Sequence, residues 1–234
     1  MSAFTFKHFR INQDRATMKV GTDAMVLGSF VDVTDKFQGL DIGTGTAIIS
    51  MMVAQRNSTA AITAIEIDEK AITDANFNVK NCPWSNRIKI IQSSLQEFIP
   101  NLKFDSIISN PPFFENSLKS NSKSKIKARH TDSLHYSDIL NFASIHLSNI
   151  GVLHLILPVE NAEKCIETAI EGGFYLKRIC KVHPVPNKNA HRFLFELTKT
   201  ATPTITESLI IETGKRHDYS QDYIALTKGF YTIM

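Results

Sequence analysis

The stretch LDIGTGT, residues 40–46, decides the fold class, because a short apolar run ends there in two glycines and a helical pattern follows. Glycines let the backbone approach a ligand closely, and the free N–H groups at a helix start bind anions. A GxGxxG dinucleotide fingerprint would require a third glycine where Ile48 stands, and the GxxxxGK phosphate loop is absent from the sequence. The loop therefore argues against a dinucleotide or a nucleoside triphosphate as its ligand.

Short β-like runs alternate with helical patterns around this loop, which is typical of a doubly wound, mostly parallel sheet covered on both faces. The last two runs are joined by residues 183–187, too few for a crossover helix, so we expect an antiparallel C-terminal hairpin. The seven expected strands are 40–42, 61–65, 88–91, 104–108, 152–157, 175–182 and 192–197. The expected helices are 48–56, 69–79, 137–147 and 161–171. The sequence thus predicts an α/β fold with a seven-stranded sheet.

Composition predicts an ordinary globular chain of 234 residues, 43% hydrophobic and 21% charged. It has no apolar window of about 18 residues and no secretory leader, so we expect no membrane contact. Cys82, Cys165 and Cys180 lie far apart without a CxxC pair, which argues against disulfides and zinc. We therefore expect a cytoplasmic protein without metal, with a main domain at 37–234 after an extension at 1–36.

Positive charge is concentrated in two segments. The net charge is +3 over the whole chain, but residues 1–20 carry +3 and residues 116–131 carry +5, so the remainder carries −5. Two basic patches on an acidic body suggest a polyanionic partner, although solvated segments are the plain alternative. Residues 115–133 also contain almost no large apolar side chains, so we expect a mobile basic loop beside the site.

Two acids end neighbouring expected strands. Glu66 follows the run at 61–65, a position from which a carboxylate can bind both hydroxyls of a ribose. Asp41 ends the first run, where it could meet an ammonium group or a bound water of the same ligand. The alternative is that Glu66 and Asp68 only cap the following helix, a role that Asp68 fits well.

Three motifs together resemble a known enzyme class. DIGTGT at 41–46 and IEID at 65–68 resemble motifs one and two of class I S-adenosylmethionine-dependent methyltransferases, and NPPF at 110–113 resembles the [N/D]PP[F/Y] motif of amino-group methyltransferases. The resemblance implies a Rossmann-like class I methyltransferase fold and S-adenosylmethionine as cofactor. One departure is Ala47, which stands where the class often has a third glycine, and we expect a slightly tighter loop there.

The NPPF residue types suit methyl transfer to an exocyclic amino group, whose lone pair is delocalised. The prolines end the strand and fix two acceptors, the Asn110 side-chain carbonyl and the Pro111 backbone carbonyl, before substrate arrives. Both can accept an N–H bond and aim the lone pair at the methyl group. Phe113 offers a stacking face that contributes roughly 1–3 kcal/mol per base. The proposed catalytic residues are Asn110, Pro111, Pro112 and Phe113; a purely structural turn is the alternative.

The N-terminal sequence resembles one particular family within this enzyme class. FKHFRINQD at 6–14 and MKVGTDA at 18–24 closely resemble the opening of the bacterial family that methylates N6 of an adenine in valine tRNA, next to the anticodon. ARH at 128–130 and LTKGFY at 226–231 are also similar to that family. The resemblance implies that residues 1–36 close over the cofactor site and that the partner is a tRNA anticodon stem-loop. We expect a monomer.

The resemblance also assigns residues to the ligands. A second departure is Ser94, where many relatives carry an acid for the adenine amino group, while the Leu95 N–H can serve the adenine ring. The implied cofactor contacts are Lys19, Thr22, Asp23, Asp41, Gly43, Gly45, Glu66, Ile67, Ser94, Leu95 and Asn110. The implied RNA contacts are Lys7, Arg10, Lys123, Lys125, Lys127, Arg129 and His130.

Other functions share parts of this pattern. The same NPP[F/Y] chemistry serves ribosomal guanine-N2 and protein-glutamine methyltransferases, but the former often carry a duplicated domain and the latter a partner-binding domain before the glycine loop. A binding module with a degenerate cofactor site is a further alternative, against which Gly43, Gly45, Glu66 and Asn110 all speak. His183 and His191 are expected to be surface histidines rather than RNA contacts.

Overall fold

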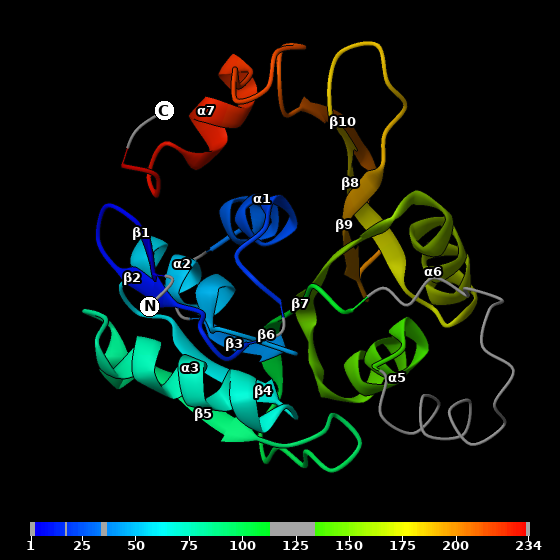
Figure 1. Cartoon of the computed structure of the whole chain (residues 1–234). Coiled ribbons are helices and arrows are strands. Elements are labelled where there is room, and N and C mark those ends of the chain that lie inside the picture. The colour runs from blue at the N-terminus through cyan, green and yellow to red at the C-terminus, as the bar shows by residue number, and fades with distance from the viewer. Residues whose placement is uncertain (1–2, 17, 34–36, 113–133, 233–234) are drawn as a thin grey trace, which may run out of the picture.

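A central eight-stranded sheet organises the molecule, in a computed structural model that describes residues 3–16, 18–33, 37–112 and 134–232 (Figure 1). The strand order is β10-β8-β9-β7-β6-β3-β4-β5. Only β9 runs antiparallel to its neighbours, β7 and β8, and every other pairing in the sheet is parallel. The strands are β3 (Gln38–Ile42), β4 (Ala61–Glu66), β5 (Ile88–Gln92), β6 (Phe104–Ser109), β7 (Leu147–Pro158), β8 (Tyr175–His183), β9 (Arg192–Thr198) and β10 (Ile205–Ile210).

Helices cover both faces of the sheet (Figure 1). The helices are α1 (Thr22–Phe30), α2 (Ile48–Arg56), α3 (Glu69–Lys80), α5 (Tyr136–His146), α6 (Val159–Glu171), α7 (Gln221–Thr227) and the 3-10 turn η1 (Ser85–Arg87). One core cluster joins α1, α2 and α3 to the sheet, and a second joins α5 and α6 to the other face. The pleat separates them: Ile108 packs in the first cluster and its neighbour Ile107 in the second.

The doubly wound α/β architecture and the antiparallel β8–β9 hairpin are confirmed, but the expected count of seven strands is wrong. The eighth strand, β10, lies at the sheet edge and pairs in parallel with β8. Its sequence, ITESLI, is half apolar and half polar without strict alternation, and Leu209 is its one buried side chain. Such an edge strand gives a weak hydrophobic pattern, because its pairing with β8 rather than burial defines it.

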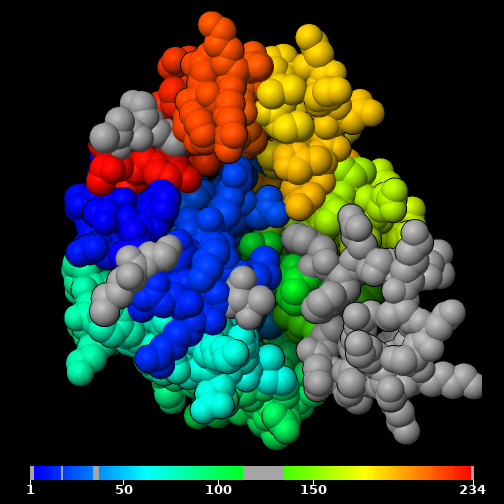
Figure 2. Space-filling view, in the orientation of Figure 1, coloured from blue at the N-terminus to red at the C-terminus, as the bar shows by residue number. Residues whose placement is uncertain are grey.

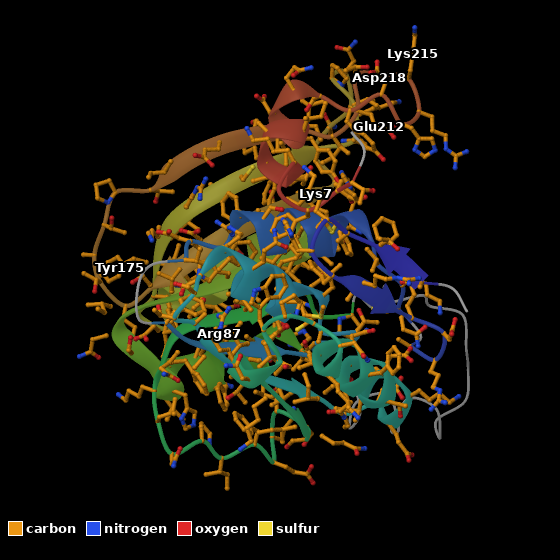
Figure 3. The ribbon with its side chains drawn as sticks, turned by 90° about the vertical axis from the view of Figure 1, so that its left-hand side faces the viewer. Lys7, Arg87, Tyr175, Glu212, Lys215 and Asp218 are labelled. Carbon is orange, nitrogen blue, oxygen red and sulfur yellow. The ribbon has the colours of Figure 1, made fainter. Side chains whose placement is uncertain are left out.

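Residues next to the glycine loop determine where helices α2 and α3 begin. Asp68 caps α3 by accepting a hydrogen bond from the Lys70 N–H at 2.9 Å, as expected. Helix α2 begins without a side-chain cap, after Ala47 in a left-handed conformation with φ 65°. At the other end of α2, the inward-pointing guanidinium of Arg87 donates to the Ala54 and Asn57 carbonyls (Figure 3). Both ends of α2 are therefore fixed by loops rather than by its own sequence.

The N-terminal residues pack into the main body of the fold. The short hairpin of β1 (Ala3–Thr5) and β2 (Arg10–Asn12) precedes helix α1, which is almost entirely buried and packs against α2. Phe6 bridges to Tyr231, and the Lys7 N–H donates to the Phe230 carbonyl, so the two ends of the chain meet. In Figure 2 the N-terminal segment, coloured blue, crosses one face from the red C-terminal segment to the cyan region of α3.

Membrane-spanning helices and metal-binding clusters are both absent from the described ranges. No helix there is long and apolar enough to cross a membrane. No cluster of His, Cys, Asp and Glu within the same residues is placed to hold a metal ion. The expected mobile basic loop, 115–133, lies outside the described residues.

Candidate active site

A cavity of about 460 Å³ opens at the carboxyl ends of β3, β4 and β6. The strand register brings three distant sequence motifs to this edge, since Ile42 pairs with both Ile65 and Ser109. Strand β3 is the point where the chain order of the sheet changes direction, which is where open α/β sheets bind ligands. The lining includes the glycine loop, residues 65–68, residues 93–96, Asn110, Pro112, Leu134, His191 and the N-terminal residues Ala16 and 18–24.

The glycine loop has a fixed backbone conformation. Gly43 and Gly45 have backbone φ values of 68° and 58°, which residues other than glycine rarely adopt. The N–H groups of Gly43 and Thr44 both donate to the Ile65 carbonyl, at 2.9 and 3.0 Å. The loop is thus anchored to the end of β4 and presents its backbone to the cavity.

Glu66 is held in place by three backbone N–H groups. One carboxylate oxygen accepts from Gly45 at 2.9 Å, and the other accepts from Ile67 at 2.9 Å and Asp68 at 3.0 Å. The side chain therefore ties the loop to the start of α3 and lines the cavity at the same time. With two lone pairs on each oxygen, the oxygen that binds Ile67 and Asp68 is fully used and the one that binds Gly45 keeps one acceptor site, so a fixed carboxylate with one open site faces the space where a ribose would lie.

Asp41 is placed differently from Glu66. It is 1% exposed and is not part of the cavity wall. Its Oδ2 accepts from the hydroxyls of Thr44 and Ser50, each at 2.6 Å, which links the glycine loop to α2. Burial raises the pKa of this carboxyl above its ordinary value, although the two hydroxyl bonds act against the rise. In this structure Asp41 supports the loop from behind.

Asn110 follows β6 directly and lines the cavity. The preceding Ser109 hydroxyl donates to the Ile42 carbonyl at 2.8 Å, which fixes the end of β6 against β3. Within the described part of the chain, the buried Asn110 Oδ1 accepts no hydrogen bond. Pro112 also lines the cavity, Pro111 is buried, and Phe113 lies outside the described residues. The structure thus leaves one oriented carbonyl oxygen unpaired at the edge of the site.

The expected contacts for the cofactor's adenine lie after β5. Ser94 and Leu95 both line the cavity. The Ser94 hydroxyl donates to the Glu97 carboxylate at 2.9 Å and accepts from the Glu97 N–H at 3.2 Å. Its proton is therefore engaged, and its remaining lone pair can accept from an amino group.

An ion pair holds Asp23, one of the residues that line the cavity. Asp23, at the start of α1, accepts a hydrogen bond from Arg192 of β9 at 2.9 Å. The neighbouring His191 is exposed, as expected for a surface histidine, yet it also lines the cavity. Desolvation of the ring, together with the charge of Arg192, lowers the pKa of His191 below its ordinary value. Sequence reasoning did not place His191 in the site, because its position depends on the reversed direction of β9.

The expected RNA contacts are only partly described. Lys7 lies beside the C-terminal segment, where its Nζ donates to the Lys228 carbonyl at 2.6 Å (Figure 3). Arg10 is exposed on β2. Lys123, Lys125, Lys127, Arg129 and His130 all lie outside the described residues. The structure therefore gives Lys7 a contact inside the protein that the sequence did not predict.

The walls of the cavity match two parts of one cofactor: the Glu66 carboxylate suits a ribose, and residues 93–96 suit a base. Together with the fold, they define a class I methyltransferase that uses S-adenosylmethionine. The model of the methyltransferase small domain family matches residues 16–170. A predicted O-methyltransferase from Agrobacterium tumefaciens has a similar structure, with a TM-score of 0.69 and 23% identity over 89% of this chain and 96% of that one.

Two curated relatives make the assignment more specific. One from Trichodesmium erythraeum is 43% identical over 97% of each chain. One from Flavobacterium psychrophilum is 38% identical over 99% of this chain and 100% of the relative. Both are named tRNA1(Val) (adenine(37)-N6)-methyltransferase. This chain belongs to that family, and the expected fold class, cofactor and enzyme class are confirmed.

Proposed function

We propose that this protein transfers the methyl group of S-adenosylmethionine to N6 of adenine 37 in tRNA1(Val). Asn110 Oδ1, which lies at the cavity edge and accepts no hydrogen bond from the described residues, carries the proposal. An exocyclic amino group needs a fixed acceptor that draws its lone pair out of conjugation, and Asn110 offers one. The names of the relatives supply the substrate, and no observation favours guanine N2 or a glutamine side chain instead.

The other site residues take supporting roles. S-adenosylmethionine supplies an activated methyl group, so the protein has only to position two ligands and exclude water. Glu66 holds the ribose hydroxyls, Gly43 and Gly45 allow the close approach of the cofactor, and Ser94 and Leu95 contact its adenine. The amino-acid end lies toward Lys19, Thr22 and Asp23, and Ile67 packs against the cofactor. Asp41 acts through the loop rather than by contact.

The amino group is held by neighbouring acceptors. Asn110 Oδ1 and the Pro111 carbonyl each accept one N–H of the target base, while Pro112 shapes the wall and Phe113 stacks on the base. The methylated nitrogen is positively charged and acidic, so its proton passes to water without a strong general base. No step requires a metal ion.

The RNA contacts are proposed from charge. Arg10 is exposed and able to reach a phosphate, and Lys7 keeps two further N–H donors besides its bond to Lys228. Lys123, Lys125, Lys127, Arg129 and His130 supply the larger basic segment. We further propose that residues 1–36 close one side of the cofactor site and that the enzyme acts as a monomer in the cytoplasm.

Methyl transfer from labelled S-adenosylmethionine tests this function. The acceptors are unmodified total tRNA, ribosomal RNA and release factor, each digested afterwards to nucleosides or amino acids. We expect N6-methyladenosine from tRNA alone. N2-methylguanosine from ribosomal RNA or methylglutamine would contradict the substrate, and the absence of any labelled product with good cofactor binding would contradict the activity.

A further inference from the structure

Two buried polar side chains on α3 have no role in the proposed chemistry. Asp74 and Asn78 are each 1% exposed and neither lines the cavity. Their four-residue spacing places them on the same face of the helix. Buried polar groups are costly unless they are hydrogen-bonded, so their partners indicate what they are for.

Asp74 binds the backbone of the N-terminal segment. Its Oδ2 accepts from the N–H groups of Arg15 at 2.8 Å and Ala16 at 2.9 Å. Its Oδ1 accepts from the Asn12 side-chain amide at 3.4 Å. One carboxylate thus fixes the chain at two consecutive peptide groups, in charge-assisted hydrogen bonds that are stronger than neutral ones.

Asn78 joins the same segment to the glycine loop. Its Oδ1 accepts from the Asn12 N–H at 2.7 Å, and its Nδ2 donates to the Asn12 carbonyl at 2.9 Å. The second N–H of Nδ2 donates to the Thr46 carbonyl at 3.0 Å. A primary amide has one carbonyl and two N–H groups, so all of its polar groups are used.

The segment anchored in this way continues into the cavity wall. We call residues 12–16 and 18–22 the strap; Ala16 and all of 18–22 line the cavity. Within the strap, the Gln13 carbonyl accepts from Lys19 Nζ, and Gln13 Oε1 accepts from the Val20 N–H at 2.7 Å. The strap therefore turns on itself before it reaches the cofactor site. Asp74 and Asn78 anchor it to the main fold.

We propose that Asp74 and Asn78 are positioning residues that lock the strap to the glycine loop and so set the affinity for the cofactor without touching it. The proposal rests on the proposed function only in taking S-adenosylmethionine as the ligand. Because Asn78 bonds the strap at Asn12 and the glycine loop at Thr46, the strap and the loop hold one relative position. By linkage, cofactor binding in turn tightens the strap.

The substitution Asn78→Asp tests the proposal at constant side-chain size. It removes both N–H donors and places a carboxylate against two carbonyl oxygens. We expect S-adenosylmethionine binding, measured by titration calorimetry, to weaken about ten-fold or more. Trypsin should cleave faster after Arg15 and Lys19. In the transfer assay, KM for S-adenosylmethionine should rise while kcat at saturating cofactor is retained, a split that a loss of folded protein would not produce.

The matched control is Asn76→Asp, the same chemical change at an exposed position on the same helix. It should bind cofactor and resist trypsin as the wild type does. Binding by Asn78→Asp within about two-fold of wild type, with unchanged strap cleavage, would overturn the proposal.

A measurement on the wild type covers the case in which Asn78→Asp does not fold. The amide hydrogens of Asn12, Arg15 and Ala16 are the donors to Asp74 and Asn78, so their exchange should slow when S-adenosylmethionine is added. Unchanged exchange on cofactor binding would overturn the coupling. A wild type that shows this protection but methylates no RNA would refute the proposed substrate while leaving the positioning role intact.

Discussion

The side-chain oxygens of the site have two different roles: the carboxylates of Glu66 and Asp41 bind the glycine loop, and the amide oxygen of Asn110 is available to a substrate. Glu66 accepts three backbone N–H bonds and Asp41 two hydroxyl bonds, so both acids hold the glycine loop still. Asn110 Oδ1 accepts none among the described residues and is left for an incoming amino group. A site organised before its ligands bind loses little entropy on binding, which is the general route to efficient transfer.

Gly45 allows a residue-scale prediction. A Cβ added at Gly45 would meet no atom within 4 Å, and the same holds for Gly173, which follows α6 and does not line the cavity. Both glycines have positive φ, so Gly45→Ala and Gly173→Ala should each cost about 1 kcal/mol of stability. Only Gly45→Ala should also weaken S-adenosylmethionine binding, by about ten-fold. Urea unfolding and calorimetry check both, and equal cofactor binding by the two variants would contradict the assigned loop contact.

Single residues were predictable where a strand end fixes their direction. Glu66 and Asn110 follow β4 and β6, and parallel strands bring their carboxyl ends to one edge. The inward position of Asp41 was not predictable, because it depends on Ser50 lying across the loop on α2. The anchoring role of Asp74 and Asn78 was not predictable either. In the sequence they are only polar residues of a helix, and their role depends on contacts with the N-terminal segment.

At the scale of elements, a row of ionisable side chains crosses four neighbouring strands. Glu196 of β9 is 1% exposed and lies between His154 of β7 and Arg178 of β8, at 3.5 and 3.8 Å. Arg178 also binds Glu207 of β10 at 2.7 Å and lies over the Phe30 ring of α1 at 3.7 Å. The row therefore connects the predicted hairpin to the unpredicted edge strand and to α1.

Removing the Glu196 carboxylate should lower the free energy of unfolding. Glu196→Gln leaves the buried His154 and the partly exposed Lys177 and Arg178 without their carboxylate, and a buried polar group that loses its partner costs about 1–3 kcal/mol of stability. Glu207→Gln is the control, since Glu207 is 39% exposed and exposed pairs contribute less than about 1 kcal/mol. Urea denaturation of the two variants measures the difference. Equal stability losses would contradict the buried role of Glu196.

The same carboxylate makes stability depend on pH. Burial raises the pKa of Glu196, but His154, Lys177 and Arg178 outweigh burial and lower it below the ordinary value of 4.5. A lowered folded-state pKa gives stability that is present above the unfolded-state pKa and is lost as pH falls through the folded-state pKa. Between neutral pH and acid, Glu196→Gln should therefore lose less stability than the wild type, by thermal unfolding at each pH. Parallel curves would contradict this assignment.

Elements were predictable where their apolar residues follow a periodic pattern. The four expected helices have nearly the same bounds as α2, α3, α5 and α6, and the seven expected strands all exist. Strand β10 and helix α7 were missed, because the first is mostly exposed and the second is a short terminal helix. Helix α1 is apolar on every side rather than amphipathic, so it gave no periodic signal.

At the scale of the whole molecule, the N-terminal and C-terminal segments contact each other. Charge is also distributed unevenly along the chain. The N-terminal hairpin joins the C-terminal segment through Phe6, Lys7 and Tyr231. The basic residues of 1–20 and 116–131 stand out from an acidic remainder. Composition predicted a polyanionic partner, but a charge pattern alone does not say which RNA it meets.

Salt dependence tests this charge pattern. Replacing Lys123, Lys125 and Lys127 with glutamine should weaken tRNA binding and reduce the slope of log K against log salt by about 0.7 per lost phosphate contact. The control replaces Lys80, Lys89 and Lys164, which are exposed outside the cavity and carry the same total charge. Filter binding across a salt series measures both. Identical slopes for the two triple variants would contradict a specific RNA role for the basic segment.

The most direct test of the whole account separates chemistry from cofactor binding at Asn110. Wild type and Asn110→Ala are each given S-adenosylmethionine and transcribed tRNA1(Val), with adenine or guanine at position 37, and N6-methyladenosine is quantified. We predict product only from the wild type with adenine 37, a fall of about 100-fold or more in Asn110→Ala, and nearly equal cofactor binding by both proteins. Retained turnover by Asn110→Ala, or equal methylation of the guanine-37 tRNA, would contradict the account.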